Sequence, residues 1–267
     1  MPPAPYFRCM KTLRAPIFGV LAAIAITSTM DATGLSTFSA LPLFPLLGLF
    51  WYLQRFSRAE VGLAWGQRRH YGLAALYPLS VVGAIILIAA ASGVIDISHT
   101  NWKKAALNFA LVTASNLLVV IITEEGFFRG WLWASLGRAG LRQPGILIWS
   151  SIAFSLWHWS AVMLNTGFNP PRAQVPVFMV NAIVMGAVWG LLRWISGSVI
   201  VSSVSHGLWN AMAYVFFGFG TRVGALGIKN TGFFAPEVGF LGLAVNLIFA
   251  VALWRWWKSR PRAAAST

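Results

Sequence analysis

Cysteine and acidic residues are nearly missing from this chain. Cys9 is the only cysteine, so the sequence excludes a disulfide framework and a cysteine-rich metal site. Asp and Glu together number 6 among 267 residues, and all charged residues make up 10%. Soluble domains carry about 25% charged residues. So few charges cannot cover a water-facing surface, which excludes an ordinary soluble globule.

Apolar residues make up most of the remaining composition. They make up 58% of the chain, the mean hydropathy is +0.70, and no internal repeat is found, which excludes disorder, collagen and coiled coils. Stretches of about 20 apolar residues can cross a bilayer as helices. The sequence predicts an all-α polytopic membrane protein with eight spans. These are Leu13–Met30, Leu35–Tyr52, Tyr71–Ile95, Ala105–Leu136, Gly145–Leu164, Val175–Trp194, Ser198–Phe217 and Val238–Trp257.

The basic residues are spread through the connections and tails, a pattern that favours membrane orientation over nucleic-acid binding. With eight spans, one side holds fourteen Lys and Arg and the other holds five, so both termini are predicted to be cytoplasmic. The inner set is Arg8, Lys11, Arg14, Arg55, Arg58, Arg68, Arg69, Arg138, Arg142, Arg193, Arg255, Lys258, Arg260 and Arg262. The outer set is Lys103, Lys104, Arg172, Arg222 and Lys229.

The chain is predicted to be one integral membrane domain in three parts. Residues 1–102 hold the first spans and an interfacial segment, residues 103–220 a helical core, and residues 221–267 the last span and a basic tail. No soluble catalytic domain is expected, so any chemistry has to take place within the membrane. Lipids are expected partners, and nucleic acid is not.

Ionisable groups inside spans are costly and therefore point to a functional site. In the fourth span Glu125 and Arg129 are four residues apart, which predicts an ion pair along one helix face. Glu124 points about 100° away from Glu125 on a helix and has no local partner. Such a carboxylate, surrounded by apolar helices, is suited to proton transfer.

Two further spans carry polar groups at a similar depth. His158 lies in the fifth span, and His206 and Asn210 share a helix face in the seventh. Counting 1.5 Å per residue, these three and Glu124 lie roughly 12–20 Å from the inner ends of their spans. Purely structural polar groups need not meet at one depth, whereas the groups of an active site must.

Three ordered motifs carry a resemblance to a known family. They are Glu124-Glu125-Gly126-Phe127-Phe128-Arg129, Phe154 to His158, and His206 to Asn210. They resemble the Glu-Glu-x-x-x-Arg, Phe-x-x-x-His and His-x-x-x-Asn signature of the CPBP family of intramembrane proteases. That family includes the type II CAAX prenyl endopeptidases and the bacterial Abi-type proteins. The resemblance covers about residues 103–220.

The resemblance implies a fold and a set of roles. It implies eight helices around a conical cavity open toward the cytosol. Glu124 would activate water, His158 would hold that water, and His206 with Asn210 would form an oxyanion hole. The supporting residues would be Glu125 and Arg129, which orient the site, and Phe154, which packs beside His158. The activity implied is that of a glutamate-dependent, CAAX-type intramembrane endopeptidase without a cofactor.

Other functions stay open at this point. Glu124, His158 and His206 could instead bind zinc in a metalloprotease, although a His-Glu-x-x-His motif is absent. A non-enzymatic transporter or bacteriocin-immunity scaffold is a further alternative. The expected location is the bacterial cytoplasmic (inner) membrane, and the expected substrate is a membrane-associated peptide or protein that could be lipidated.

Overall fold

The structure is a computed structural model that describes residues 5–164, 167–220 and 222–260, with side chains from residue 13 onward. Cys9, Arg8 and Lys11 therefore lie outside the described side chains, and Arg262 lies outside the described residues. The predicted all-α membrane fold is confirmed. The described part holds eight helical stretches long and apolar enough to cross a membrane. They are Leu13–Ala32, Ser36–Gln54, Arg68–Ala91, Trp102–Arg138, Gln143–Met163, Arg172–Ser196, Val199–Phe217 and Phe240–Lys258.

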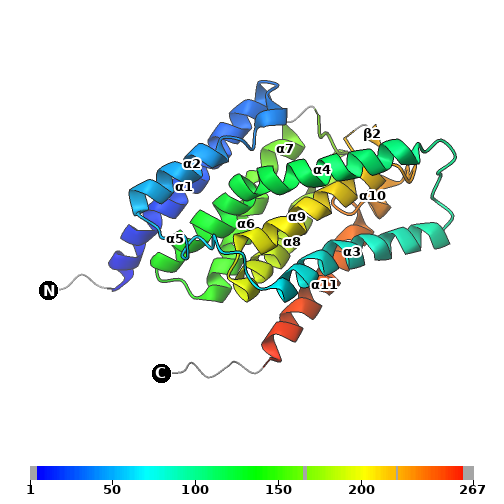
Figure 1. The fold of residues 1–267 in the computed structure, drawn as a ribbon. Helices are drawn as coiled ribbons and strands as arrows, with labels where there is room; N and C mark the ends of the chain where they lie inside the picture. The colour runs from blue at the N-terminus through cyan, green and yellow to red at the C-terminus, as the bar shows by residue number, and fades with distance from the viewer. Residues whose placement is uncertain (1–4, 165–166, 221, 261–267) are drawn as a thin grey trace.

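The helices form a bundle in which α8 and α9 are central and the others pack around them (Figure 1). The only strands within the described residues are two short ones that pair antiparallel, Gly218 with Val223 and Phe219 with Arg222. The elements are α1 (Pro5–Ala32), η1 (Ser36–Phe38), α2 (Leu43–Gln54), α3 (Arg68–Ala91), α4 (Trp102–Ile122), η2 (Gly126–Leu132), α5 (Trp133–Arg138), α6 (Gln143–Trp157), α7 (Trp159–Met163), η3 (Arg172–Gln174), α8 (Val175–Ser196), α9 (Val199–Met212), η4 (Ala213–Phe217), β1 (Gly218–Phe219), β2 (Arg222–Val223), α10 (Thr231–Phe234) and α11 (Phe240–Lys258).

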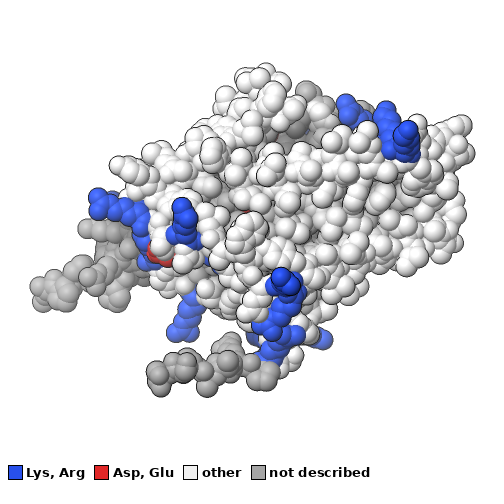
Figure 2. All heavy atoms as spheres, in the orientation of Figure 1, with Lys and Arg blue, Asp and Glu red and all other residues white. Residues whose placement is uncertain are grey.

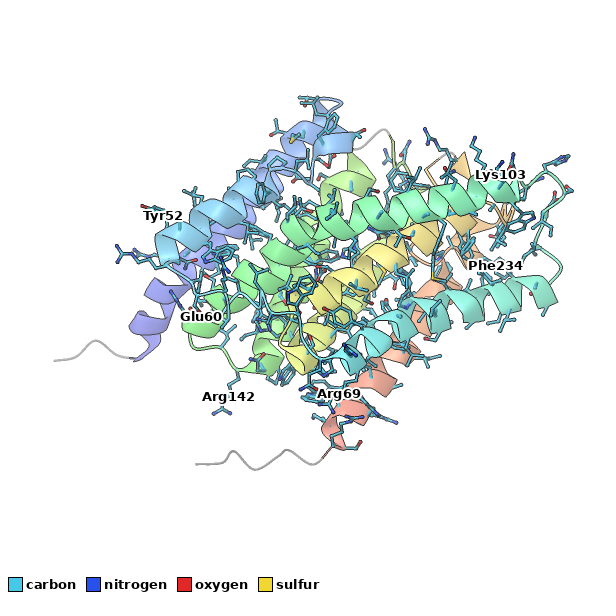
Figure 3. All side chains as sticks on the ribbon, in the orientation of Figure 1. Tyr52, Glu60, Arg69, Lys103, Arg142 and Phe234 are labelled. Atoms are coloured by element: carbon cyan, nitrogen blue, oxygen red, sulfur yellow. The ribbon has the colours of Figure 1, made fainter. Side chains whose placement is uncertain are left out.

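The distribution of charged and exposed apolar side chains is the one expected for a protein in a bilayer. Figure 2 shows the Lys and Arg side chains gathered at the ends of the bundle, with a broad uncharged band between them. Large apolar side chains on this band face outward, among them Leu87, Leu118 and Ile248, each about 70% exposed. Figure 3 places Glu60, Arg69 and Arg142 at one end and Lys103 at the other. Such a surface is stable in lipid and not in water.

The fourth span is not one continuous helix. Its α-helix α4 ends at Ile122, Thr123 adopts φ −112° and ψ −97°, and the π-helical turn η2 follows from Gly126. Gly126 permits this turn, because a Cβ atom there would lie 2.5 Å from the carbonyl oxygen of Ile121. Glu124 and Glu125 are helical, as expected, but they lie in the short stretch between this break and η2. Glu124 lies directly at the break.

The fifth span is interrupted as well, and the break falls at His158. This residue ends α6 and begins α7, with φ −75° and ψ −5°. Interrupted helices within a membrane place polar backbone and side chains where they line a cavity. The two breaks therefore indicate where a polar cavity lies.

Close contact between α4 and α9 aligns the remaining polar groups. A Cβ atom at Gly207 would lie 3.1 Å from the backbone nitrogen of Leu117, a tight contact, so glycine favours this close approach of the two backbones. At the basic end, the Arg193 side chain is buried and donates to the carbonyl oxygens of Arg129 and Glu60. Arg193 thus joins the α2–α3 connection to η2.

Candidate active site

A cavity of about 480 Å³ lies among α1, α6, α8 and α9. All four residues for which a catalytic role is predicted, namely Glu124, His158, His206 and Asn210, line this one cavity. Aromatic side chains form much of the remaining wall: Phe154, Trp157, Phe178, Trp189, Tyr214 and Phe219. A mostly apolar cavity with a few convergent polar groups is the usual form of a small-ligand or active site.

The cavity opens at the end of the bundle opposite both termini. Its buried part is at His206 and Asn210, and its exposed rim includes Gly34 and Thr37, which follow α1, and Phe219, which follows η4. The first residues of α1 and the last residues of α11 lie at the other end (Figure 1). The resemblance implies that the cavity opens to the cytosol, and the charge bias predicts that both termini are cytosolic. Because the opening and the termini lie at opposite ends, only one of these two expectations can be right. If the charge bias sets the orientation, the cavity faces away from the cytosol.

The Glu124 carboxylate faces both histidines. Its Oε2 lies 3.8 Å from His158 Nε2 and 3.8 Å from His206 Nε2. This separation is too long for direct hydrogen bonds, and a water bound between these atoms could contact all three. The His158 ring is fixed by its other nitrogen, because Nδ1 lies 2.9 Å from the carbonyl oxygen of Phe154. A carbonyl only accepts, so Nδ1 carries the proton and the neutral ring turns a lone pair toward Glu124.

The predicted ion pair between Glu125 and Arg129 is present, and it extends to His206. Glu125 Oε1 lies 3.0 Å from Arg129 Nη1 and 3.0 Å from His206 Nδ1, and all three side chains are buried. Arg129 Nη2 also donates to the carbonyl oxygen of Gly186 at 3.0 Å. Since the carboxylate accepts, His206 Nδ1 carries a proton and Nε2 points into the cavity. The spacing did not predict this link to His206.

Aromatic rings hold the two imidazoles in place. Trp189 stacks on His206 with ring centres 3.7 Å apart and planes 13° apart. Phe154 packs beside His158, as the resemblance implies, with ring centres 4.4 Å apart, and the Arg129 guanidinium lies 4.3 Å from the centre of the same Phe154 ring. Phe154 therefore contacts both the histidine and the buried cation.

Asn210 has a partner that the motifs did not include. Its Nδ2 donates to Asn116 Oδ1 at 2.9 Å, and Asn116 Nδ2 donates to the carbonyl oxygen of Val112. An amide group carries two N–H donors, so the second donor of Asn210 is available to the cavity. Asn116 precedes Glu124 by eight residues on the same span, a spacing of about two helical turns that could have indicated a shared face.

The wall also holds Glu237, a carboxylate that sequence reasoning missed. It lies between α10 and α11, and its Oε1 accepts a hydrogen bond from Trp209 Nε1 at 3.1 Å. The available signal was an acidic residue in an apolar stretch just before the last span. Within the described residues, no group of three His, Cys, Asp or Glu side chains is placed to hold a metal ion.

The motifs of this site lie within a match to a known family. Residues 106–212 match the family described as type II CAAX prenyl endopeptidase Rce1-like. The central part of the chain is similar to this CPBP family. The match spans Glu124 to Arg129, Phe154 to His158 and His206 to Asn210, and it ends before Glu237. No curated protein matches the chain significantly. The match is to a family of CAAX-type intramembrane proteases, and the described residues include eight helical stretches long and apolar enough to cross a membrane.

Proposed function

We propose that this protein is an intramembrane endopeptidase in which Glu124 activates water to hydrolyse a peptide bond. The observation that carries the proposal is the position of Glu124 Oε2, 3.8 Å from Nε2 of both His158 and His206 in one cavity. Peptide hydrolysis needs a base, a water molecule and an electrostatic stabiliser around one reacting carbon. This cavity supplies groups suited to each task from three separate spans.

The first step is attack by water on the scissile carbonyl carbon. The water donates one hydrogen bond to Glu124 and a second to His158 Nε2, whose lone pair is free because Nδ1 donates to Phe154. Glu124 takes a proton as the oxygen of the water bonds to carbon. The carbonyl oxygen becomes an oxyanion. Glu124 then returns the proton to the amide nitrogen, the C–N bond breaks, and the products are a carboxylic acid and an amine.

The second N–H of Asn210 is the donor proposed for the oxyanion. Asn116 holds the first donor, so the amide plane is fixed before substrate arrives. His206 donates from Nε2 only when its ring carries two protons, since Nδ1–H already bonds to Glu125. In that form the ring lies between two carboxylates, with Nδ1 3.0 Å from Glu125 and Nε2 3.8 Å from Glu124.

We propose that hydrolysis does not require a metal. Glu124, His158 and His206 are the zinc ligands of the alternative mechanism. That mechanism gives Asn210 and Asn116 no role. Full activity in strong chelator, with less than stoichiometric zinc by elemental analysis, is the expected result. Loss of activity in chelator that zinc restores would instead support the metalloprotease.

The substrate we propose is a peptide or protein segment at the surface of the bacterial inner membrane. Under the orientation that the charge bias predicts, this segment enters from the side opposite the cytosol, because the rim lies opposite the termini. A lipid-modified segment fits the aromatic wall. A prenylated tail on the cytosolic face requires the reverse orientation.

Substitution of the base tests the proposal directly. Glu124→Gln keeps the shape of the side chain and removes the proton acceptor. We expect at least about a 10³-fold loss of kcat in purified protein with unchanged folding. The matched control is Glu60→Gln, a carboxylate exposed at the basic end that forms a salt bridge with Arg138. Full hydrolysis by Glu124→Gln would show that another group is the base.

A further inference from the structure

Glu237 stands apart from the three motifs, yet it shares their cavity. It lies outside the family match and in a connection between helices instead of a span. The mechanism above gives it no task. A carboxylate on the wall of a membrane cavity is costly unless something binds it, so the positions of its backbone and side chain need a physical explanation.

A buried polar network fixes the backbone at this residue. Asn181 Nδ2 on α8 donates to the carbonyl oxygens of Pro236 at 2.8 Å and Glu237 at 2.9 Å. Asn246 on α11 donates to Asn181 Oδ1 at 3.0 Å, and the Tyr77 hydroxyl on α3 donates to Asn246 Oδ1 at 2.7 Å. All three side chains are fully buried. Three spans thus contribute to holding one loop against the cavity.

The side chain of Glu237 is left without a cation. Trp209 Nε1 donates to Oε1, and Trp209 is itself held by stacking on Tyr77 with ring centres 5.1 Å apart. The carboxyl group is only partly buried and lines the cavity. Among the described residues no Lys or Arg lines this cavity, and none forms a salt bridge with Glu237. The described wall therefore presents two carboxylates, Glu124 and Glu237, and no Lys or Arg.

This environment also favours the neutral form of the Glu237 carboxyl group. Burial raises the pKa of the Glu237 carboxyl to about 7, against the hydrogen bond from Trp209, which lowers it. A cation placed beside the carboxyl would reverse this effect and favour the charged form. The Glu237 carboxyl group is therefore suited to binding a positively charged group.

We propose that Glu237 binds a basic side chain, Lys or Arg, of the peptide substrate and so selects the peptide bond presented to Glu124. The inference rests on the endopeptidase function proposed above and adds a substrate class to it. An ammonium or guanidinium group supplies both the positive charge and the hydrogen-bond donors that the carboxylate lacks. Because the surrounding helices lower the local dielectric constant, this pairing is stronger in the cavity than at an exposed surface.

Matched peptides test the preference. Each pair of internally quenched peptides differs only by Lys or norleucine at one position, scanned over three residues on either side of the scissile bond. We expect wild-type protein to show at least about tenfold higher kcat/KM for Lys at one position. Glu237→Gln should abolish this difference while still cleaving the norleucine peptide, and Glu60→Gln should retain it. Equal values for both peptides at every position would overturn the proposal, as would an unchanged preference in Glu237→Gln.

A binding measurement separates this proposal from the function on which it rests. The Glu124→Gln variant keeps Glu237, so fluorescent Lys and norleucine peptides can be compared by anisotropy without cleavage. One outcome is tighter binding of Lys peptides, lost in Glu237→Gln, together with no hydrolysis by wild-type protein. It would overturn the endopeptidase function and retain the basic-residue site. Hydrolysis with no Lys preference in either assay would overturn the site alone. No binding and no hydrolysis of any peptide would overturn both.

Discussion

Glu125 and His206 lie 81 residues apart in the chain and meet across a distance of 3.0 Å between Oε1 and Nδ1. The same carboxylate oxygen lies 3.0 Å from Arg129 Nη1. A buried carboxylate is therefore shared by a permanent cation and by the imidazole that faces the cavity. The arrangement fixes which ring nitrogen of His206 is directed at the substrate.

Removing the cation from this set should destabilise the fold. Arg129→Ala leaves the Glu125 charge buried without its permanent cation, and stranding one member of a buried pair costs about 3–5 kcal/mol. We expect a much lower Tm and a lower yield in detergent. The comparison is Glu60→Gln, which removes one member of the exposed pair with Arg138 and should change Tm little. A Tm for Arg129→Ala equal to that of wild type would show that the pair does not stabilise the bundle.

Truncation of the two asparagines should lower turnover by different amounts. Asn210→Ala removes a donor from the proposed oxyanion site, which is typically worth about 10²–10³ in kcat. Asn116→Ala removes only the acceptor that orients Asn210, so we expect roughly a five- to tenfold loss. KM should change little in either variant. Thr113→Ala is the control on α4, because Thr113 donates only to the carbonyl oxygen of Phe109 in its own helix. Equal losses for Asn116→Ala and Asn210→Ala would contradict this ranking.

Much of the fold and part of the site could be predicted from sequence. Eight apolar stretches gave the number of spans, because span length is set by bilayer thickness. Spacing alone gave the Glu125–Arg129 pair, and depth along each span brought Glu124, His158, His206 and Asn210 to one level. The structure places these four around one cavity. Their catalytic roles stay predictions.

Helix breaks and long-range partners could not be predicted in the same way. Residues 121–124 contain neither Gly nor Pro, so nothing local marks the end of α4 at Ile122. The following turn η2 packs against α2 and α6, contacts that the local sequence does not specify. Glu237 was missed because periodicity describes spans and says nothing about the path of a loop. That path is fixed by Asn181, on a helix 56 residues away in the chain.

The side of the membrane on which the cavity opens can be measured with single cysteines. The expected orientation puts both termini in the cytosol, so reporter fusions at Arg69 and at the carboxy terminus should both read cytoplasmic. In a Cys9→Ser background, Thr37→Cys at the rim should react with a membrane-impermeant thiol reagent added to intact cells. Arg142→Cys at the opposite end should react only after permeabilisation. The reverse labelling pattern would show that the charge bias does not set the orientation and that the cavity opens to the cytosol.

Stability should depend on pH through Glu237. Its pKa is about 7 in the folded protein, and the usual glutamate value is 4.5, so the folded state binds this proton more tightly than the unfolded state. The contribution of Glu237 to stability therefore falls as pH rises from about 4.5 to about 7, and stays low above that. The ionisable groups that act on it or respond to it are Glu124, His206, Tyr77 and Tyr214.

Replacing this carboxyl with a neutral amide should remove that dependence. Glu237→Gln keeps an oxygen to accept from Trp209 and carries no charge at any pH. We expect its Tm to match that of wild type near pH 5 and to exceed it at pH 8, measured in the same detergent. Glu60 provides the control of opposite sign, since hydrogen bonds from Ser57 lower the pKa of the Glu60 carboxyl. Glu60→Gln should therefore not gain in Tm at pH 8. A Tm difference between Glu237→Gln and wild type that is the same at both pH values would show that Glu237 is charged in the folded protein throughout this range.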